Sequence, residues 1–95
     1  MVNFEKQASM FKVLSVGTRI RILELLKGGP LCVNALAKRL GVTPSAVSQN
    51  LRILRDADLV VADKQGYFVH YGINRQTMTE LRSLANGVFS MPNLL

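Results

Sequence analysis

Apolar residues recur every three or four positions along much of the chain, which predicts amphipathic helices. The first stripe lies in residues 4–16 and ends at Gly17. A second follows in IRILELLKGG, for which Thr18 is a suitable N-cap. The Gly-Gly-Pro run at residues 28–30 ends this second helix, because glycine tolerates the conformation after a last turn and proline cannot prolong it.

The next segment predicts two helices joined by a short turn. Asn34 is a plausible N-cap for the helix in NALAKRLG, and Gly41 stands where its C-terminal cap belongs. Thr43 can cap the following helix, and Pro44 fits the first position because its missing N–H would have no intrahelical partner there. These signals predict a helix-turn-helix over residues 34–57.

The second helix of this pair has an apolar row and a polar row. At about 100° per residue, Val47, Leu51 and Leu54 point one way and a separate arc is polar. Gln can form two hydrogen bonds to adenine, Arg can form two to guanine, and Ser can form a hydrogen bond with more than one kind of base. We therefore expect this arc to read a DNA major groove, the alternative being an ordinary solvated outer face. The predicted base-reading residues are Ser45, Ser48, Gln49 and Arg52.

After Leu59 the spacing of apolar residues changes to every second position, which predicts strands. Gln65 and Gly66 mark the turn of a β-hairpin over residues 59–73, and Gly66 supplies the positive φ of a tight turn. A hairpin directly after a helix-turn-helix is a wing. Lys64 near its tip is placed to contact a phosphate, although a purely structural hairpin fits the pattern equally well. The alternation puts His70 on the exposed side.

Asn74 can cap a last helix over residues 75–89. The earlier segments already provide enough apolar residues for a core, so the apolar stripe of this helix is not needed there. We predict that this helix and the helix of residues 4–16 form a contact between two subunits; packing within one chain is the alternative. The predicted fold is a single domain over residues 1–95, mainly α with a small β-hairpin: a winged helix-turn-helix of about five helices plus a two-stranded wing. The predicted contact residues are Phe4, Ala8, Phe11, Met78, Leu81, Leu84, Ala85 and Val88.

The charge balance favours a polyanionic partner. Twelve Lys and Arg stand against six Asp and Glu, a formal net charge of +6. From Gly28 to Arg55 there is no carboxylate, and the cations Lys38 and Arg39 join Thr43 and Lys64 in the predicted DNA contact. A solvated face that lacks acids is the competing interpretation. No apolar run is long enough to cross a bilayer and MVNFEKQASM lacks a signal-peptide core, so we expect a cytoplasmic protein that binds double-stranded DNA rather than a membrane.

Enzyme and metal chemistry find little support in the sequence. There is no nucleophile with a base and an orienting group, no phosphate-binding glycine loop and no paired carboxylate set. The chain has one cysteine, Cys32, and one histidine, His70, whereas zinc needs several soft or imidazole ligands. We expect no catalytic site, no metal and no cofactor.

From Phe11 to Asn74 the chain resembles the winged-helix repressors of the ArsR/SmtB family, in the segment that contains TRIRILELL, the helix-turn-helix and KQGYFVHYGIN. The resemblance implies a homodimer joined through the first and last helices, repression at imperfect palindromes, and release by an effector. The sequence departs from the family at Asn50, where His is common, and at Asn34: many metal sensors have a Cys-x-Cys pair here, of which this chain has the first thiol, Cys32, and not the second. The effector therefore stays unknown and is not expected to be a metal. A winged-helix protein-interaction module without DNA binding is the alternative function.

Overall fold

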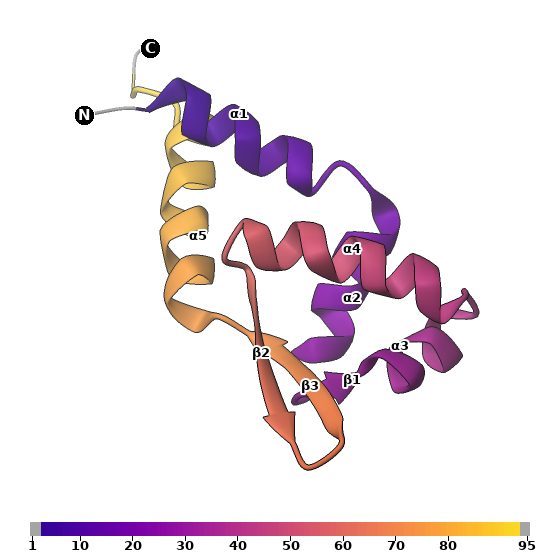
Figure 1. Cartoon of the computed structure of the whole chain (residues 1–95). Coiled ribbons are helices and arrows are strands. Elements are labelled where there is room, and N and C mark those ends of the chain that lie inside the picture. The colour runs from indigo at the N-terminus through magenta and orange to yellow at the C-terminus, as the bar shows by residue number, and fades with distance from the viewer. Residues whose placement is uncertain (1–2, 94–95) are drawn as a thin grey trace.

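The structure is a computed structural model that describes residues 3–93 of the 95-residue chain, so the ends of the predicted domain, residues 1–2 and 94–95, lie outside the described part. Figure 1 shows the arrangement of the helices around the small sheet, which confirms the predicted fold class. In chain order the elements are α1 (Phe4–Val13), α2 (Gly17–Leu26), β1 (Leu31–Cys32), α3 (Val33–Leu40), α4 (Pro44–Asp56), β2 (Val60–Gln65), β3 (Phe68–Ile73) and α5 (Arg75–Phe89).

The core lies between α2, α3, α4 and the start of β2. Each helix contributes the apolar stripe of its sequence, and burial of one such large side chain stabilises the fold by about 1.5–3 kcal/mol. Because this core takes the inward side of α4, the opposite side of that helix is left to solvent. The largest fully buried side chains are Ile22, Leu36, Val47, Leu51, Leu54, Leu59 and Val60.

Two predicted N-caps are wrong, and in both cases the helix begins two residues earlier than expected. The α2 helix starts at Gly17 with Val16 as an extended N-cap, so Thr18 lies inside the first turn. The α3 helix starts at Val33, and Asn34 is likewise inside it. Its N-cap is Cys32, which pairing in the sheet already holds in an extended conformation, so the helix begins where the strand ends.

The end of α1 also differs from the prediction, because the helix stops at Val13 rather than at residue 16. The Ser15 hydroxyl donates to the Lys12 carbonyl oxygen at 2.7 Å, which satisfies a carbonyl that a longer helix would have used. The chain is then free to turn into α2.

The turn of the helix-turn-helix forms as the sequence predicts. Gly41 caps α3 in the left-handed conformation, with φ of 69°. The Thr43 hydroxyl oxygen accepts a hydrogen bond from the Ala46 N–H at 3.1 Å and caps α4. At the start of α5, Asn74 Oδ1 accepts from the Thr77 N–H at 3.3 Å. These caps satisfy N–H groups that have no partner within their helices.

The predicted two-stranded wing forms from β2 and β3, and a third short strand that the sequence did not predict, β1, extends the sheet. The strand order is β1-β3-β2, and β1 pairs antiparallel with β3 through Leu31 opposite Tyr71 and Cys32 opposite His70. A two-residue strand is too short to show any alternation in sequence. This pairing places Cys32 beside His70, so the predicted exposure of His70 is wrong: its side chain is half-buried.

The hairpin turn lies one residue later than predicted. Gln65 still pairs with Phe68 across the hairpin, so Gly66 and Tyr67 make the turn, with a φ of 65° at Gly66. The first strand begins at Val60, one residue after the predicted start. Tyr67 is 99% exposed at the tip.

The start of α1 and the end of α5 meet at one end of the molecule (Figure 1), while Val13 and Leu14 after α1 and Met78 and Leu81 in α5 pack against the core. The ring of Phe11 meets Phe89 edge to face at 6.1 Å, and Gln7 Nε2 donates to the Leu84 carbonyl oxygen at 3.1 Å. The helices α1 and α5 therefore pack against each other within one chain, which was the alternative to a contact between two subunits. The radius of gyration is 15.2 Å, above the roughly 13 Å typical of a compact domain of this size.

The described helices are all too short or too polar to span a membrane.

Candidate nucleic-acid interface

The outward side of α4 is polar and fully accessible. Its inward side is closed by packing, because Val47 and Leu54 are completely buried and Leu51 is 1% exposed. The helix therefore cannot rotate to hide its polar row without exposing three core side chains. The residues predicted to read bases all lie on the exposed side: Ser45, Ser48, Gln49 and Arg52.

A shallow hollow of about 260 Å³ lies where α4 meets the wing. It is lined by Ser48 and Arg52, which the sequence indicated, and by Arg55 and Tyr71, which it did not. Tyr71 belongs to β3, and the alternation of side chains puts Lys64 of β2 on the same face of the sheet. The strand pattern around Tyr71 is visible in sequence, but its approach to α4 depends on how sheet and helix pack. The wing and the polar row thus form one continuous surface.

A half-buried arginine fixes the position of α4. Arg19 Nε donates to Asn50 Oδ1 at 3.1 Å, and Arg19 Nη1 donates to the Val13 carbonyl oxygen at 3.0 Å. Asn50 Nδ2 in turn donates to the Ala46 carbonyl oxygen at 2.9 Å within α4. One guanidinium therefore joins the end of α1, the first turn of α2 and the middle of α4. Asn50 performs this role at the position where the sequence departs from the ArsR/SmtB pattern.

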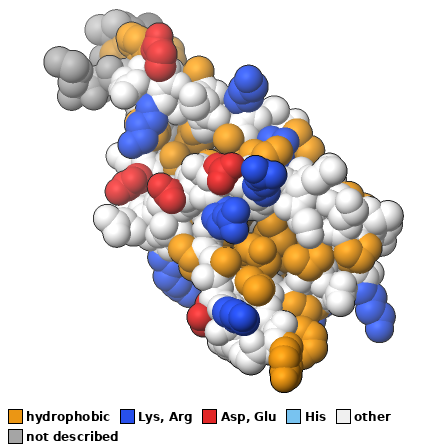
Figure 2. All heavy atoms as spheres, in the orientation of Figure 1, with side chains coloured by type: hydrophobic (Ala, Val, Ile, Leu, Met, Phe, Trp, Pro, Cys, Tyr) orange, Lys and Arg blue, Asp and Glu red, His pale blue; other side chains and the backbone are white. Residues whose placement is uncertain are grey.

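The other residues predicted to contact DNA are all exposed. Lys38 and Arg39 lie in the last turn of α3, where cations also complement the helix dipole. Thr43 begins α4 and Lys64 lies in the wing. Figure 2 shows basic side chains over α4 and on the wing, with an apolar tip below them. Within residues 3–93 the sole ion pair is elsewhere, so carboxylates neutralise none of these cations.

The chemistry of this surface is that of binding. Among the residues that the structure describes, no three His, Cys, Asp or Glu side chains come together as metal ligands. Cys32 is a half-buried free thiol that lies across the sheet from His70.

A helix-turn-helix that packs on a three-helix core, with a β-hairpin at its side, defines the winged-helix class. The sequence model of the bacterial regulatory proteins of the arsR family matches residues 17–61, from α2 to the start of the wing. The transcriptional repressor SdpR of Bacillus subtilis is 31% identical over 72 residues, which are 76% of this chain and 80% of the repressor.

Solved structures agree with the sequence comparison. One, a possible transcriptional regulator for arsenical resistance, is 36% identical with a TM-score of 0.79, over 84% of this chain and 83% of that one. Another is the homodimeric winged helix-turn-helix DNA-binding domain of a possible ArsR-family regulator from Mycobacterium bovis; it is 26% identical with a TM-score of 0.73, over 97% and 89% of the two chains. The chain belongs to the arsR family of bacterial regulatory proteins, which are transcription regulators and not enzymes.

Proposed function

We propose that the protein is a dimeric transcriptional repressor that inserts α4 into the major groove of a palindromic operator. The observation that supports this most directly is the exposed polar row of α4, with unpaired cations around it and a sealed apolar row behind it. Membership of the family and the similarity to a named repressor support the regulatory role.

In this proposal the two kinds of side chain have different tasks. Ser45, Ser48, Gln49 and Arg52 contact base edges and determine which sequence is bound. The residues that contact phosphates and set the register are Lys38, Arg39, Thr43 and Lys64. A net charge of +6 favours approach to DNA. If about six phosphates are neutralised, the logarithm of affinity falls with the logarithm of salt at a slope of about −5.

The proposed dimer uses the end of the molecule that α1 and α5 form. Phe4 is 73% exposed and Val88 44% exposed, and α5 has no buried residue in the single chain. An open apolar groove of about 460 Å³ runs between the two helices and reaches Phe11, Met78, Leu81 and Ala85. A second copy would cover these side chains together with Ala8 and Leu84, and the homodimeric relative from Mycobacterium bovis supports such an assembly. Two α4 helices about 34–36 Å apart would then enter successive major grooves.

The test is selection of bound sequences from random duplex DNA, followed by titration of the best duplex. We expect Arg52→Ala to weaken binding by about 1–3 kcal/mol and to relax the preference at one base pair. Arg21→Ala, which removes an exposed arginine of α2, is the matched control and should leave the preference unchanged. Lys38→Ala should weaken all duplexes alike and reduce the salt slope by about one.

Two results would contradict the proposal. A loss on Arg52→Ala that is equal for every sequence would make this residue a phosphate contact rather than a base reader. Binding that is absent, or that does not respond to salt, would favour the winged-helix protein-interaction module.

We further propose that a non-metal inducer releases the repressor. Cys32 has no second cysteine near it, and the described residues supply no cluster of metal ligands.

A further inference from the structure

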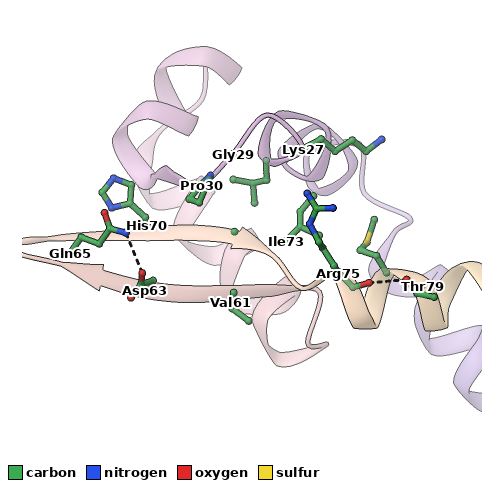
Figure 3. Close-up of a pocket in the computed structure, with 13 residues that line it drawn as sticks. Lys27, Gly29, Pro30, Val61, Asp63, Gln65, His70, Ile73, Arg75 and Thr79 are labelled. Carbon is green, nitrogen blue, oxygen red and sulfur yellow. Dashed lines mark hydrogen bonds between the residues drawn. The ribbon is translucent and has the colours of Figure 1, made fainter.

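A hollow of about 670 Å³ lies on the side of the sheet that faces away from α4. Its walls come from the end of α2, the loop that follows, the wing and the first turns of α5 (Figure 3). His70 lines it, whereas the next residue, Tyr71, faces the DNA-binding surface, because successive side chains of a strand point to opposite faces. Its size is within the range of about 300–1,000 Å³ that is common for small-molecule sites.

Arg75 is the most informative residue of this hollow. It occupies the first position of α5, where the partial positive charge of the helix end disfavours a cation, and the first turn contains no acid. The sole ion pair in residues 3–93 joins Lys27 to Glu24 at 2.7 Å, so no carboxylate of the described chain holds Arg75. Figure 3 shows its side chain reaching from the start of α5 toward the end of α2. An arginine in this position is suited to bind an anion from outside the chain.

The other polar groups of the hollow are already engaged, with one exception. Lys27 on the rim is held by Glu24, and Asp63 accepts a hydrogen bond from Gln65 Nε2 at 3.2 Å. His70 is the exception, because its Nδ1 is buried and has no hydrogen-bond partner. A buried polar atom without a partner is rare in native proteins and often marks a missing water, ion or ligand.

The remaining wall is apolar. It consists of Leu26 from α2, Pro30 from the loop, Val61 and Ile73 from the wing, and Met78 from α5. A bare phosphate would leave this wall in contact with water, whereas a ligand with an apolar body would cover it.

We propose that this hollow binds a small organic acid, whose carboxylate pairs with Arg75 and whose apolar body packs against Leu26, Pro30 and Val61. The buried Nδ1 of His70 would reach a polar substituent on that body after a rotation of the ring toward the hollow. Arginine and carboxylate form charge-assisted hydrogen bonds, and the apolar wall selects an organic acid over inorganic phosphate.

Such a ligand would regulate DNA binding, a consequence that rests on the proposed function. The hollow joins the wing to α2 and α5, and the other face of the same wing presents Lys64 and Tyr71 beside α4. A ligand that ties the wing to α5 favours one position of the wing relative to α4. By linkage, the factor by which the ligand changes DNA affinity equals the factor by which DNA changes ligand affinity.

The test is a titration of the ¹⁵N-labelled full chain, without DNA, with benzoate, hexanoate and indole-3-acetate. We expect at least one acid to shift the amide signals around the hollow in a saturable way. Arg75→Gln should weaken its binding by about tenfold or more, because a hydrogen bond to a charged group is lost. Arg21→Gln, an exposed arginine of α2 outside the hollow, is the control and should bind like the original protein.

Three outcomes would overturn the assignment: no shift with any of the three acids, equal binding by Arg75→Gln, or equal binding of benzamide or inorganic phosphate in place of benzoate. A separate titration of duplex DNA with and without the acid measures the coupling. If the acid binds and no duplex does, the proposed repressor function fails and the ligand site stands. If a duplex binds and no acid does, the reverse holds.

Discussion

Replacement of Asn50 by alanine tests whether Arg19 holds the recognition helix in place. In the structure Asn50 Oδ1 accepts from Arg19 Nε, while the same guanidinium donates to the Val13 carbonyl oxygen. Alanine removes the acceptor and leaves a half-buried guanidinium N–H without a partner in the fold. We therefore expect both lower stability and weaker positioning of α4.

The magnitude follows from two opposing effects. A hydrogen bond to a charged group contributes about 1.5–3 kcal/mol. Alanine is a better helix former than asparagine, which stabilises the variant by about 0.5 kcal/mol. The expected loss of unfolding free energy on Asn50→Ala is therefore about 1–2.5 kcal/mol. At about 4–8 °C per kcal/mol for a small domain, the melting temperature should fall by roughly 4–20 °C.

The assay is urea unfolding at a fixed protein concentration, because a dimer makes apparent stability depend on concentration. A double-mutant cycle of Arg19→Met and Asn50→Ala isolates the energy of the pair from losses at other partners. Asn86→Ala is the matched control, since Asn86 is an exposed helical asparagine of α5. We expect a coupling energy near 1 kcal/mol or above, and a coupling below about 0.3 kcal/mol would refute the argument.

Three further changes test the helix-turn-helix, each by urea unfolding. Thr43→Ala should lower the free energy of unfolding by about 1 kcal/mol because the N-cap of α4 is lost. Ser45→Ala, which removes a hydroxyl that does not cap the helix, should lower it much less. Equal losses would contradict the role of Thr43 as the cap. Gly41→Ala should lower the free energy of unfolding by about 1–2 kcal/mol. The cause is the φ of 69° alone, since a Cβ at Gly41 meets nothing within 4 Å. Gly17→Ala is the control and should not destabilise the protein, because Gly17 has helical backbone. Leu54→Ala should cost about 2–5 kcal/mol, and a smaller loss would mean that the core collapses around the cavity.

The elements that sequence predicts well are those whose signals are local. The stripe of Val47, Leu51 and Leu54 fixes both the helix and its buried side, and Gly41 and Thr43 act on residues within four positions of themselves. Such signals do not depend on the rest of the fold, so the helix-turn-helix and the exposed row of α4 follow from the sequence alone.

The errors have a common cause in contacts between distant segments. Because Cys32 pairs with His70 of β3, it is both a strand residue and the N-cap of α3. The expected cap at Asn34 is therefore wrong, and so is the expected exposure of His70. Tyr71 joins the candidate site because the sheet packs beside α4. The bond from Arg19 to Asn50 joins residues 31 positions apart, and no periodicity or cap signal specifies such a pair.

The same bond links the two halves of the proposed repressor. In the proposed dimer, α1 and α5 set how the two copies sit against each other, and the spacing between the two α4 helices must match the pitch of DNA. The Val13 carbonyl at the end of α1 and Asn50 in α4 share the guanidinium of Arg19, so a change in the position of α1 is transmitted to α4 through hydrogen bonds rather than through loose packing. The hollow at Arg75 lies at the other end of this arrangement, between α5 and the wing. A ligand there would contact the wing, whose other face presents Tyr71 beside α4, and would thereby act on the DNA-binding surface without touching α4.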